Sequence, residues 1–145
     1  MVYVKSNEPE LIVHFICLFD FISQKFPGVV IYVEAWLIDE LSKAIEADKT
    51  IAEQFKVITG PNYPPKVFIN IDEDARMTID HIITMGGDGT VLWASRQFHG
   101  HHCPPMITFH MEQSLCFLAN FQFDANTLDR VIPDMLSVQF EVDLD

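Results

Sequence analysis

The sequence predicts an α/β fold, a mostly parallel sheet with helices on both faces, and three observations favour it. Apolar runs alternate with helical patterns in the order strand, helix, strand, helix. The run 29–33 is apolar and mostly β-branched, as in a strand covered on both faces. A third run, at 82–85, opens into a glycine-rich turn followed by a helical pattern, which places polar groups at the carboxyl end of a strand.

The first half of the chain supplies two strand–helix pairs. They are expected at Met1–Lys5, Pro9–Phe26, Val29–Val33 and about Trp36–Phe55. Ser6 and Asn7 are residue types that cap a helix, and Pro27 and Gly28 stop the first one. That helix is apolar almost all round, which predicts burial, whereas the charged residues of the second predict a solvated face.

The second half of the chain carries shorter elements. Strands are expected at Val67–Ile71, Ile82–Met85, Met106–Phe109 and Phe140–Leu144, and helices at Val91–Phe98 and Asn126–Leu136. Asp72–Asp74 is interpreted as a solvated turn, and His110–Leu118 as a turn with a short helical piece. Phe121 and Phe123 are expected in the core, and Pro133 would kink or shorten the last helix.

Composition limits the partners and the compartment. The 145 residues are enough for one domain, and a net charge of −12 argues against nucleic acid and anionic membranes as partners. The apolar run Leu11–Ile22 is too short to span a bilayer. Cys17, Cys103 and Cys116 lack CxxC spacing and are interpreted as reduced thiols, which predicts a cytoplasmic protein.

The candidate functional segment is the turn Gly86-Gly87-Asp88-Gly89-Thr90. Glycines allow close approach of a ligand, and the N–H groups that begin the next helix suit a phosphate. A carboxylate would be unfavourable in a turn that only binds phosphate, because like charges repel. The carboxylate of Asp88 instead suits Mg²⁺, a hydroxyl group or a proton. The alternative is a tight turn in which Asp88 only caps a helix, but the motif directly after an apolar strand favours function.

Metal ligation is also considered for a second segment. His99, His101, His102 and Cys103 are the right donor types for zinc. Their spacing matches no standard zinc frame, and the segment connects a helix to a strand. The sequence therefore predicts no metal-ligating residues there.

Residues 80–123 resemble the NAD kinases of the eukaryotic type. Three pieces match in order: Gly86–Ser95, Pro104–His110, and Ser114–Leu118 ahead of Asn120 and Phe121. The resemblance implies a Rossmann-like N-terminal α/β domain at 1–139, with 140–145 as the start of a missing all-β domain. It also implies that a family-like homo-oligomer would require that missing domain.

The resemblance further implies an activity and its site. NAD kinases transfer the ATP γ-phosphate to the 2′-hydroxyl of the NAD adenosine ribose, which makes NADP, and the matching residue Asp88 would accept the proton. The implied substrates and cofactors are ATP, NAD and Mg²⁺ or another divalent cation. The implied nucleotide-binding residues are Gly86, Gly87, Asp88, Gly89, Thr90, Leu115 and Phe117, of which Phe117 would lie against the adenine of NAD.

The chain departs from the family pattern in three places. Glu112-Gln113 and Cys116 replace glycines of a small-residue turn, and the family's Asn-Glu pair and second domain are absent. The chain is therefore expected to be a truncated NAD kinase. Two alternatives stay open: a non-catalytic isoform, pseudo-kinase or interaction module, and a lipid or sugar kinase that shares the Gly-Gly-Asp-Gly-Thr turn.

Overall fold

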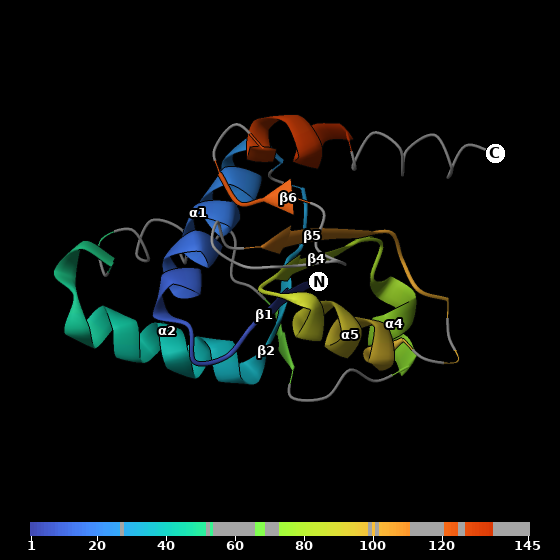
Figure 1. The fold of residues 1–145 in the computed structure, drawn as a ribbon, viewed down its shortest axis with the longest axis horizontal. Helices are drawn as coiled ribbons and strands as arrows, with labels where there is room; N and C mark the ends of the chain where they lie inside the picture. The colour runs from blue at the N-terminus through green and yellow to red at the C-terminus, as the bar shows by residue number, and fades with distance from the viewer. Residues whose placement is uncertain are drawn as a thin grey trace.

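The strands of the computed structural model form one parallel sheet (Figure 1). The structure describes residues 1–26, 28–51, 53, 66–68, 73–98, 100, 102–110, 121–124 and 127–134. The six strands are β1 (Val2–Val4), β2 (Tyr32–Glu34), β3 (Lys66–Phe68), β4 (Ile82–Met85), β5 (Met106–His110) and β6 (Phe121–Gln122). They lie in the order β3-β2-β1-β4-β5-β6, and every neighbouring pair is parallel, which confirms the predicted α/β fold.

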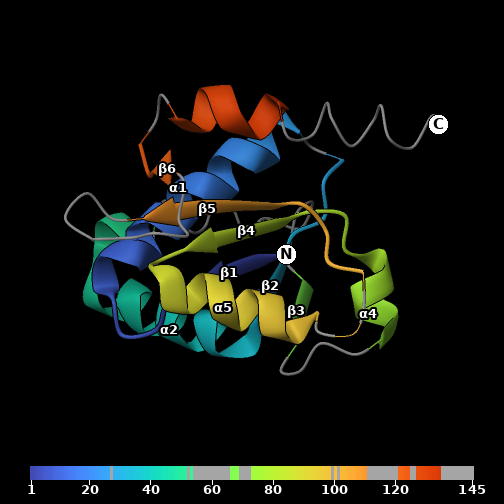
Figure 2. The ribbon, with the colours of Figure 1, turned by 45° about the vertical axis from the view of Figure 1, so that its right-hand side comes forward.

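Helices cover both faces of this sheet. The described helices are α1 (Pro9–Lys25), α2 (Ala35–Ala47), α4 (Glu73–Thr78), α5 (Asp88–Gln97) and the helical residues 127–134. Figures 1 and 2 show α1 and α2 on one side of the sheet and α5 on the other. The core divides accordingly, because one buried cluster joins α1 and α2 to the sheet and a second joins α5 to it.

The strand order reverses direction between β1 and β4. From β1 the chain moves through α1 to β2, whereas from β4 it moves through α5 to β5 on the other side. The backbone N–H of Lys5 donates to the carbonyl oxygen of Met85 at 2.9 Å, so the carboxyl ends of the two central strands lie side by side. In open α/β sheets this reversal leaves a crevice where ligands bind.

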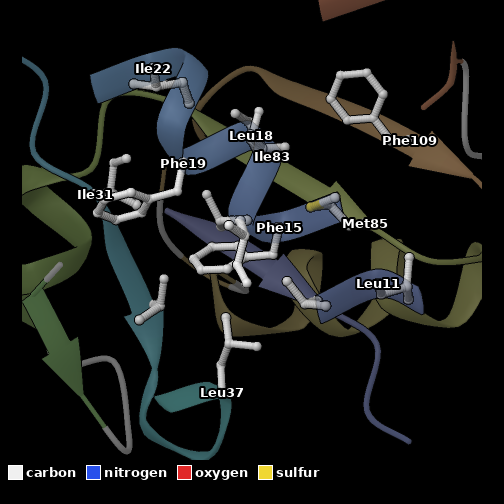
Figure 3. Close-up of a cluster of buried hydrophobic side chains, with 14 of the residues drawn as sticks. Leu11, Phe15, Leu18, Phe19, Ile22, Ile31, Leu37, Ile83, Met85 and Phe109 are labelled. Atoms are coloured by element: carbon white, nitrogen blue, oxygen red, sulfur yellow. The ribbon is translucent and has the colours of Figure 1, made fainter. Parts of the chain in front are cut away.

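Helix α1 packs its apolar side chains against those of the sheet (Figure 3). Phe15 and Leu18 are 1% and 0% exposed, in contact with a cluster that includes Ile83 and Met85 of β4. Burial of such a side chain contributes about 1.5–3 kcal/mol each. The predicted burial of this helix is confirmed, while its outward-facing Val13 stays exposed.

The second strand is shorter than predicted. The sequence predicts Val29–Val33, but the described strand begins at Tyr32, and Val29 and Val30 are exposed. The N–H of Val29 donates to the carbonyl of Phe26 at 3.0 Å, so this residue belongs to the turn that follows α1. The prediction of a strand from Val29 is therefore wrong, because the helix-terminating turn uses its backbone.

The second helix is also interrupted. Asp48 has extended backbone angles (φ −141, ψ 118) and ends α2, whereas the sequence predicts one helix to Phe55. The Asp48 carboxylate accepts the N–H of Thr50 at 2.9 Å, which starts a separate helical segment at residues 49–51. An aspartate that binds nearby backbone N–H groups competes with helix continuation.

Two local predictions near helix starts are wrong. Neither Ser6 nor Asn7 caps α1, because Glu8 holds the N-cap position without a side-chain hydrogen bond. Asn7 instead takes the left-handed region (φ 61), which asparagine tolerates. Glu73 and Asp74, predicted as a solvated turn, begin helix α4, although Asp74 is exposed as expected.

Residues 127–134 pack in the same buried cluster as α1, on the face of the sheet that α1 covers. The carboxylate of Asp124 accepts the backbone N–H of Thr127 at 2.7 Å and its hydroxyl at 2.9 Å, which is a capping interaction. Leu128 and Ile132 are buried in the same cluster as α1, and Phe121 and Phe123 pack against it as predicted. The predicted cap Asn126 and the predicted strand at 140–144 lie outside the described residues, as do 111–120.

None of the described helices has the length and hydropathy that crossing a membrane requires.

Candidate functional site

The glycine-rich turn connects β4 to α5, and the helix starts earlier than its apolar pattern predicts. Gly87 is the N-cap residue and Asp88 is the first helical residue, so Asp88, Gly89 and Thr90 form the first turn of α5. The first N–H groups of a helix have no intrahelical acceptor, and the helix dipole stabilises a carboxylate at this end. The alternative in which Asp88 serves as the helix cap does not hold, because Gly87 occupies that position.

Gly86 is required by the packing of the turn. Its φ is +149, and an added Cβ would lie 2.6 Å from Thr90 Oγ1 and 2.8 Å from Lys5 Cβ. Its N–H donates to the carbonyl of Phe109 at 3.0 Å, which holds the turn against β5. The missing side chain of Gly86 therefore allows Lys5 and Thr90 to converge over the end of β4.

A cleft of about 640 Å³ opens at the carboxyl ends of the central strands. Its volume falls within the roughly 300–1,000 Å³ of small-molecule sites. The described residues that line it come from the ends of β1 and β2 and from the starts of α2 and α5: Val4, Lys5, Ser6, Glu34, Trp36, Gly87, Asp88, Gly89, Thr90 and Trp93. The cleft therefore lies at the strand-order reversal, where ligands of such folds bind.

The charges in the cleft are unequal. Among the described lining residues, Lys5 is the cation, and Asp88 and Glu34 are the carboxylates. Asp88 is half-buried, and Lys5 forms an ion pair with Glu8 at 3.3 Å in which both side chains are well exposed. Because exposed pairs contribute only about 0–1 kcal/mol, the Lys5 ammonium can exchange Glu8 for an anionic ligand at little cost.

Glu34 and Trp93 join two walls of the cleft. The indole Nε1–H of Trp93 donates to Glu34 Oε2 at 3.2 Å. On the same face of the sheet, the buried Tyr3 lies in the cluster that includes Ala94 of α5. Burial first, and the charge of Glu34 second, raise the pKa of Tyr3, so its phenol stays neutral.

The structure brings together most of the site residues that the sequence predicts. Gly87, Asp88, Gly89 and Thr90 line the cleft. Gly86 lies beneath them, buried, and supports the turn. Leu115 and Phe117 lie outside the described residues, so their roles stay predictions.

Sequence reasoning missed six lining residues of the cleft, among them four with large polar or aromatic side chains. Lys5 and Glu34 stand at the carboxyl ends of β1 and β2, so the rule that parallel strands end at one edge could have indicated them. Trp93 follows Gly89 by four residues on α5, which is the spacing of one helical face. Trp36 follows β2 by two residues, and no local signal singles it out.

Among the described residues, no group of three or more His, Cys, Asp or Glu side chains could hold a metal ion. His99 and His101 lie outside that part of the chain, and Cys103 is exposed. The two cleft carboxylates do suit Mg²⁺, which binds through one or two carboxylates together with substrate phosphates.

The fold and the cleft define a doubly wound α/β protein with a ligand site at its strand-order reversal. The family model described as ATP-NAD kinase N-terminal domain matches residues 1–138. The chain therefore belongs to the NAD kinase family.

Similar proteins agree with this assignment. The chain is 32% identical over 124 residues, 86% of its length, to NAD(+) kinase of Saccharomyces cerevisiae, and covers 22% of that protein. It is 39% identical over 72 residues, 46% of its length, to probable NAD kinase 1 of Oryza sativa, and covers 13% of it. The chain thus spans less than a quarter of each of these relatives.

A solved structure shares the fold. The fold matches the crystal structure of yeast NADH kinase complexed with NADH, with a TM-score of 0.71 and 22% sequence identity. The match covers 95% of this chain and 37% of the yeast NADH kinase chain. At this identity the similarity shows the fold alone.

Proposed function

We propose that the protein carrying this chain is an ATP:NAD 2′-phosphotransferase with Asp88 as the proton acceptor. One observation carries the proposal: in a member of the NAD kinase family, Asp88 begins α5 and lines a cleft at the strand-order reversal. This is where a carboxylate can meet a substrate hydroxyl next to the N–H groups of a helix start.

The reaction moves one phosphoryl group and one proton. The 2′-oxygen of the NAD adenosine ribose attacks the γ-phosphorus of ATP, the bond to the β–γ bridging oxygen breaks, and ADP leaves. The hydroxyl proton passes to the Asp88 carboxylate. An ordinary aspartate has a pKa of about 3.9 and is a weak base, so Asp88 orients the nucleophile first and accepts the proton late. Phosphoryl transfer depends mostly on such positioning.

The turn offers the transferred phosphate a close approach. Gly89 is exposed, and no protein atom would lie within 4 Å of a Cβ added there. The space beside the Gly89 backbone is therefore open to a ligand. The Lys5 ammonium stands in the same cleft and offsets phosphate charge. This matters because the chain as a whole carries a charge of −12, which repels a polyphosphate.

A divalent cation fits the donor set of the cleft. Asp88 and Glu34 supply carboxylate oxygens, the ligand type that Mg²⁺ takes together with phosphate oxygens. When bound, Mg²⁺ would neutralise charge on the β- and γ-phosphates.

Further parts of the assignment stay predictions. These are the domain boundaries at 1–139 and 140–145, the contacts of Leu115 and Phe117 with NAD, the dependence of oligomer formation on a second domain, and the cytoplasmic location. Each follows from the family resemblance or from composition.

A substrate panel tests the proposed function. The protein, expressed from its complete reading frame, is incubated with γ-labelled ATP and Mg²⁺ and with NAD or diacylglycerol. Label at the 2′-position of NAD, sensitive to a 2′-phosphatase and absent from the lipid, is expected. Label in diacylglycerol but not in NAD would assign the glycine turn to a lipid kinase.

A non-catalytic role is the second candidate. Glu112-Gln113 and Cys116 stand where the family has glycines, so side chains would meet the dinucleotide there. Absence of label in both substrates, with a folded protein by circular dichroism, would favour this candidate.

A further inference from the structure

Both tryptophans of the chain line the same cleft. The sequence contains two, Trp36 and Trp93, and they come from different helices. Trp93 is 45% exposed, although a large apolar ring is normally more buried on a helix of a folded domain. A wall with two indoles suits a planar aromatic ligand, because stacked rings attract each other.

The ring of Trp93 is held in place before any ligand binds. Its Nε1–H donates to Glu34 Oε2 at 3.2 Å, and Glu34 directly precedes α2, which carries Trp36. The one polar atom of the indole is therefore satisfied within the protein. A ring fixed in this way loses little conformational entropy when it stacks on a ligand.

The cleft lies on one side of the Asp88 turn. Its walls come from β1, β2, α2 and the first turns of α5, so it faces the β1 and β2 side of β4. Strand β5, after which the predicted acceptor residues Leu115 and Phe117 come in the sequence, lies on the opposite side of β4 from β1 (Figure 1). A dinucleotide bound on the β5 side and a donor bound in this cleft would then approach Asp88 from opposite sides.

The charge distribution in the cleft suits the donor. Lys5 lies near the turn, close to Gly86 and Thr90, and is the cation among the described lining residues. A nucleoside triphosphate with its phosphates near Lys5 and the start of α5 can place its base against Trp93, because all of these residues line the same cleft.

We infer that Trp93 and Trp36 form the base subsite of the phosphoryl donor, in which the purine of ATP stacks against the Trp93 indole that Glu34 orients. This inference rests on the proposed function and deepens it. It assigns the donor purine to Trp93 and leaves the dinucleotide to the other side of Asp88.

Binding of three probes tests the subsite, with magnesium present and the protein expressed from its complete reading frame. ATP, inorganic triphosphate and NAD are each titrated by calorimetry and by tryptophan fluorescence. Base stacking on an aromatic side chain is lost on alanine substitution, so Trp93→Ala is expected to raise the Kd of ATP about tenfold. The same change should alter the Kd of inorganic triphosphate and of NAD by less than about twofold.

Two further variants sharpen the result. Trp93→Phe keeps a ring and should raise the Kd of ATP less than Trp93→Ala does. Leu92→Ala removes an exposed apolar neighbour on α5 that is not among the residues lining the cleft, and it should change none of the three affinities. In the wild type, ATP should quench tryptophan fluorescence and inorganic triphosphate should not.

The possible outcomes separate the inference from the proposed function. If Trp93→Ala weakens NAD instead of ATP, weakens ATP and triphosphate equally, or changes nothing, the base subsite is not at Trp93, even where NAD is phosphorylated. If ATP binding depends on Trp93 but no label reaches NAD, the nucleotide subsite stands and the phosphotransferase assignment fails.

Discussion

The indole N–H of Trp93 donates a hydrogen bond to the carboxylate of Glu34 at 3.2 Å, between residues 59 positions apart in the sequence. The bond ties the exposed face of α5 to the end of β2. It joins two walls of the cleft, because each partner stands on a different wall.

Removal of this acceptor is expected to free the Trp93 side chain. In Glu34→Ala, the indole N–H resonance of Trp93 should shift and exchange faster with solvent, while that of Trp36 should keep its position more closely. Stability should fall by less than about 1 kcal/mol, because the bond is exposed. Two-dimensional ¹H–¹⁵N NMR measures both effects. An unchanged Trp93 indole signal would show that the bond does not form in solution.

Two glycines of the turn are expected to respond in opposite ways. Gly86→Ala places a Cβ 2.6 Å from Thr90 Oγ1 at a φ of +149, so the free energy of unfolding should fall by about 2 kcal/mol or more. Gly89→Ala meets no protein atom within 4 Å and lies in a helical turn, so stability should be equal or up to about 1 kcal/mol higher. Urea denaturation compares the two.

For Gly89→Ala, activity is expected to fall even though stability does not. If phosphate approaches the backbone at Gly89, the stable Gly89→Ala variant should still lose kcat/KM for phosphate transfer. A Gly89→Ala protein with full activity would show that no ligand approaches there.

His14 gives stability a pH dependence of defined sign. Burial lowers its pKa from 6.5, against a smaller opposite effect of Glu10, and its ring stacks on Phe123 at 4.7 Å. The folded state therefore holds the proton less tightly than the unfolded state. Its contribution to stability is complete above pH 6.5 and is lost as the pH falls from there toward the lower, folded pKa.

A matched variant isolates this contribution. His14→Phe keeps a ring against Phe123 and removes the titration, so the slope of unfolding free energy between pH 7 and 5 should become smaller than in the wild type. Denaturant titrations at several pH values measure it. Equal slopes in the two proteins would exclude His14 as the source.

Arg76 connects α4 to the end of α5. Its Nε–H donates to the carbonyl of Gln97 at 2.6 Å, where the helix leaves carbonyl groups without intrahelical partners. Arg76→Met should therefore lower the unfolding free energy by about 1.5 kcal/mol. Arg96→Met, at an exposed position of the same helix end, should change it by less than about 0.5 kcal/mol. Equal losses would mean that general charge at this helix end matters, not the Arg76 bond.

The predictable part of the fold is the part that apolar runs encode. The burial of α1 and the strands β4 and β5 follow from runs long enough to have one interpretation. The start of α5 was missed because Gly89 is a poor helix former, and the surrounding packing decides the matter there. The break at Asp48 depends on one side-chain bond to Thr50, which no periodicity reveals.

The candidate site likewise has a part that the sequence indicates and a part that only the fold brings together. The Asp88 turn is contiguous in the sequence, so its residue types alone point to it. Lys5 and Glu34 join it only through the strand order, and the contact of Glu34 with Trp93 exists only in three dimensions. Sequence patterns therefore indicate the chemical group of the site but not the wall that faces it.

Steady-state phosphate transfer by Asp88→Asn tests the central claim most directly. Asparagine keeps the size of the side chain but cannot accept the proton, so kcat for NADP formation should fall at least about 100-fold. The Kd of ATP should stay within about threefold, and Asp129→Asn, at an exposed position of the helix 127–134, should behave as wild type. An Asp88→Asn protein that makes NADP at the wild-type rate would contradict the assignment of Asp88 and the account built on it.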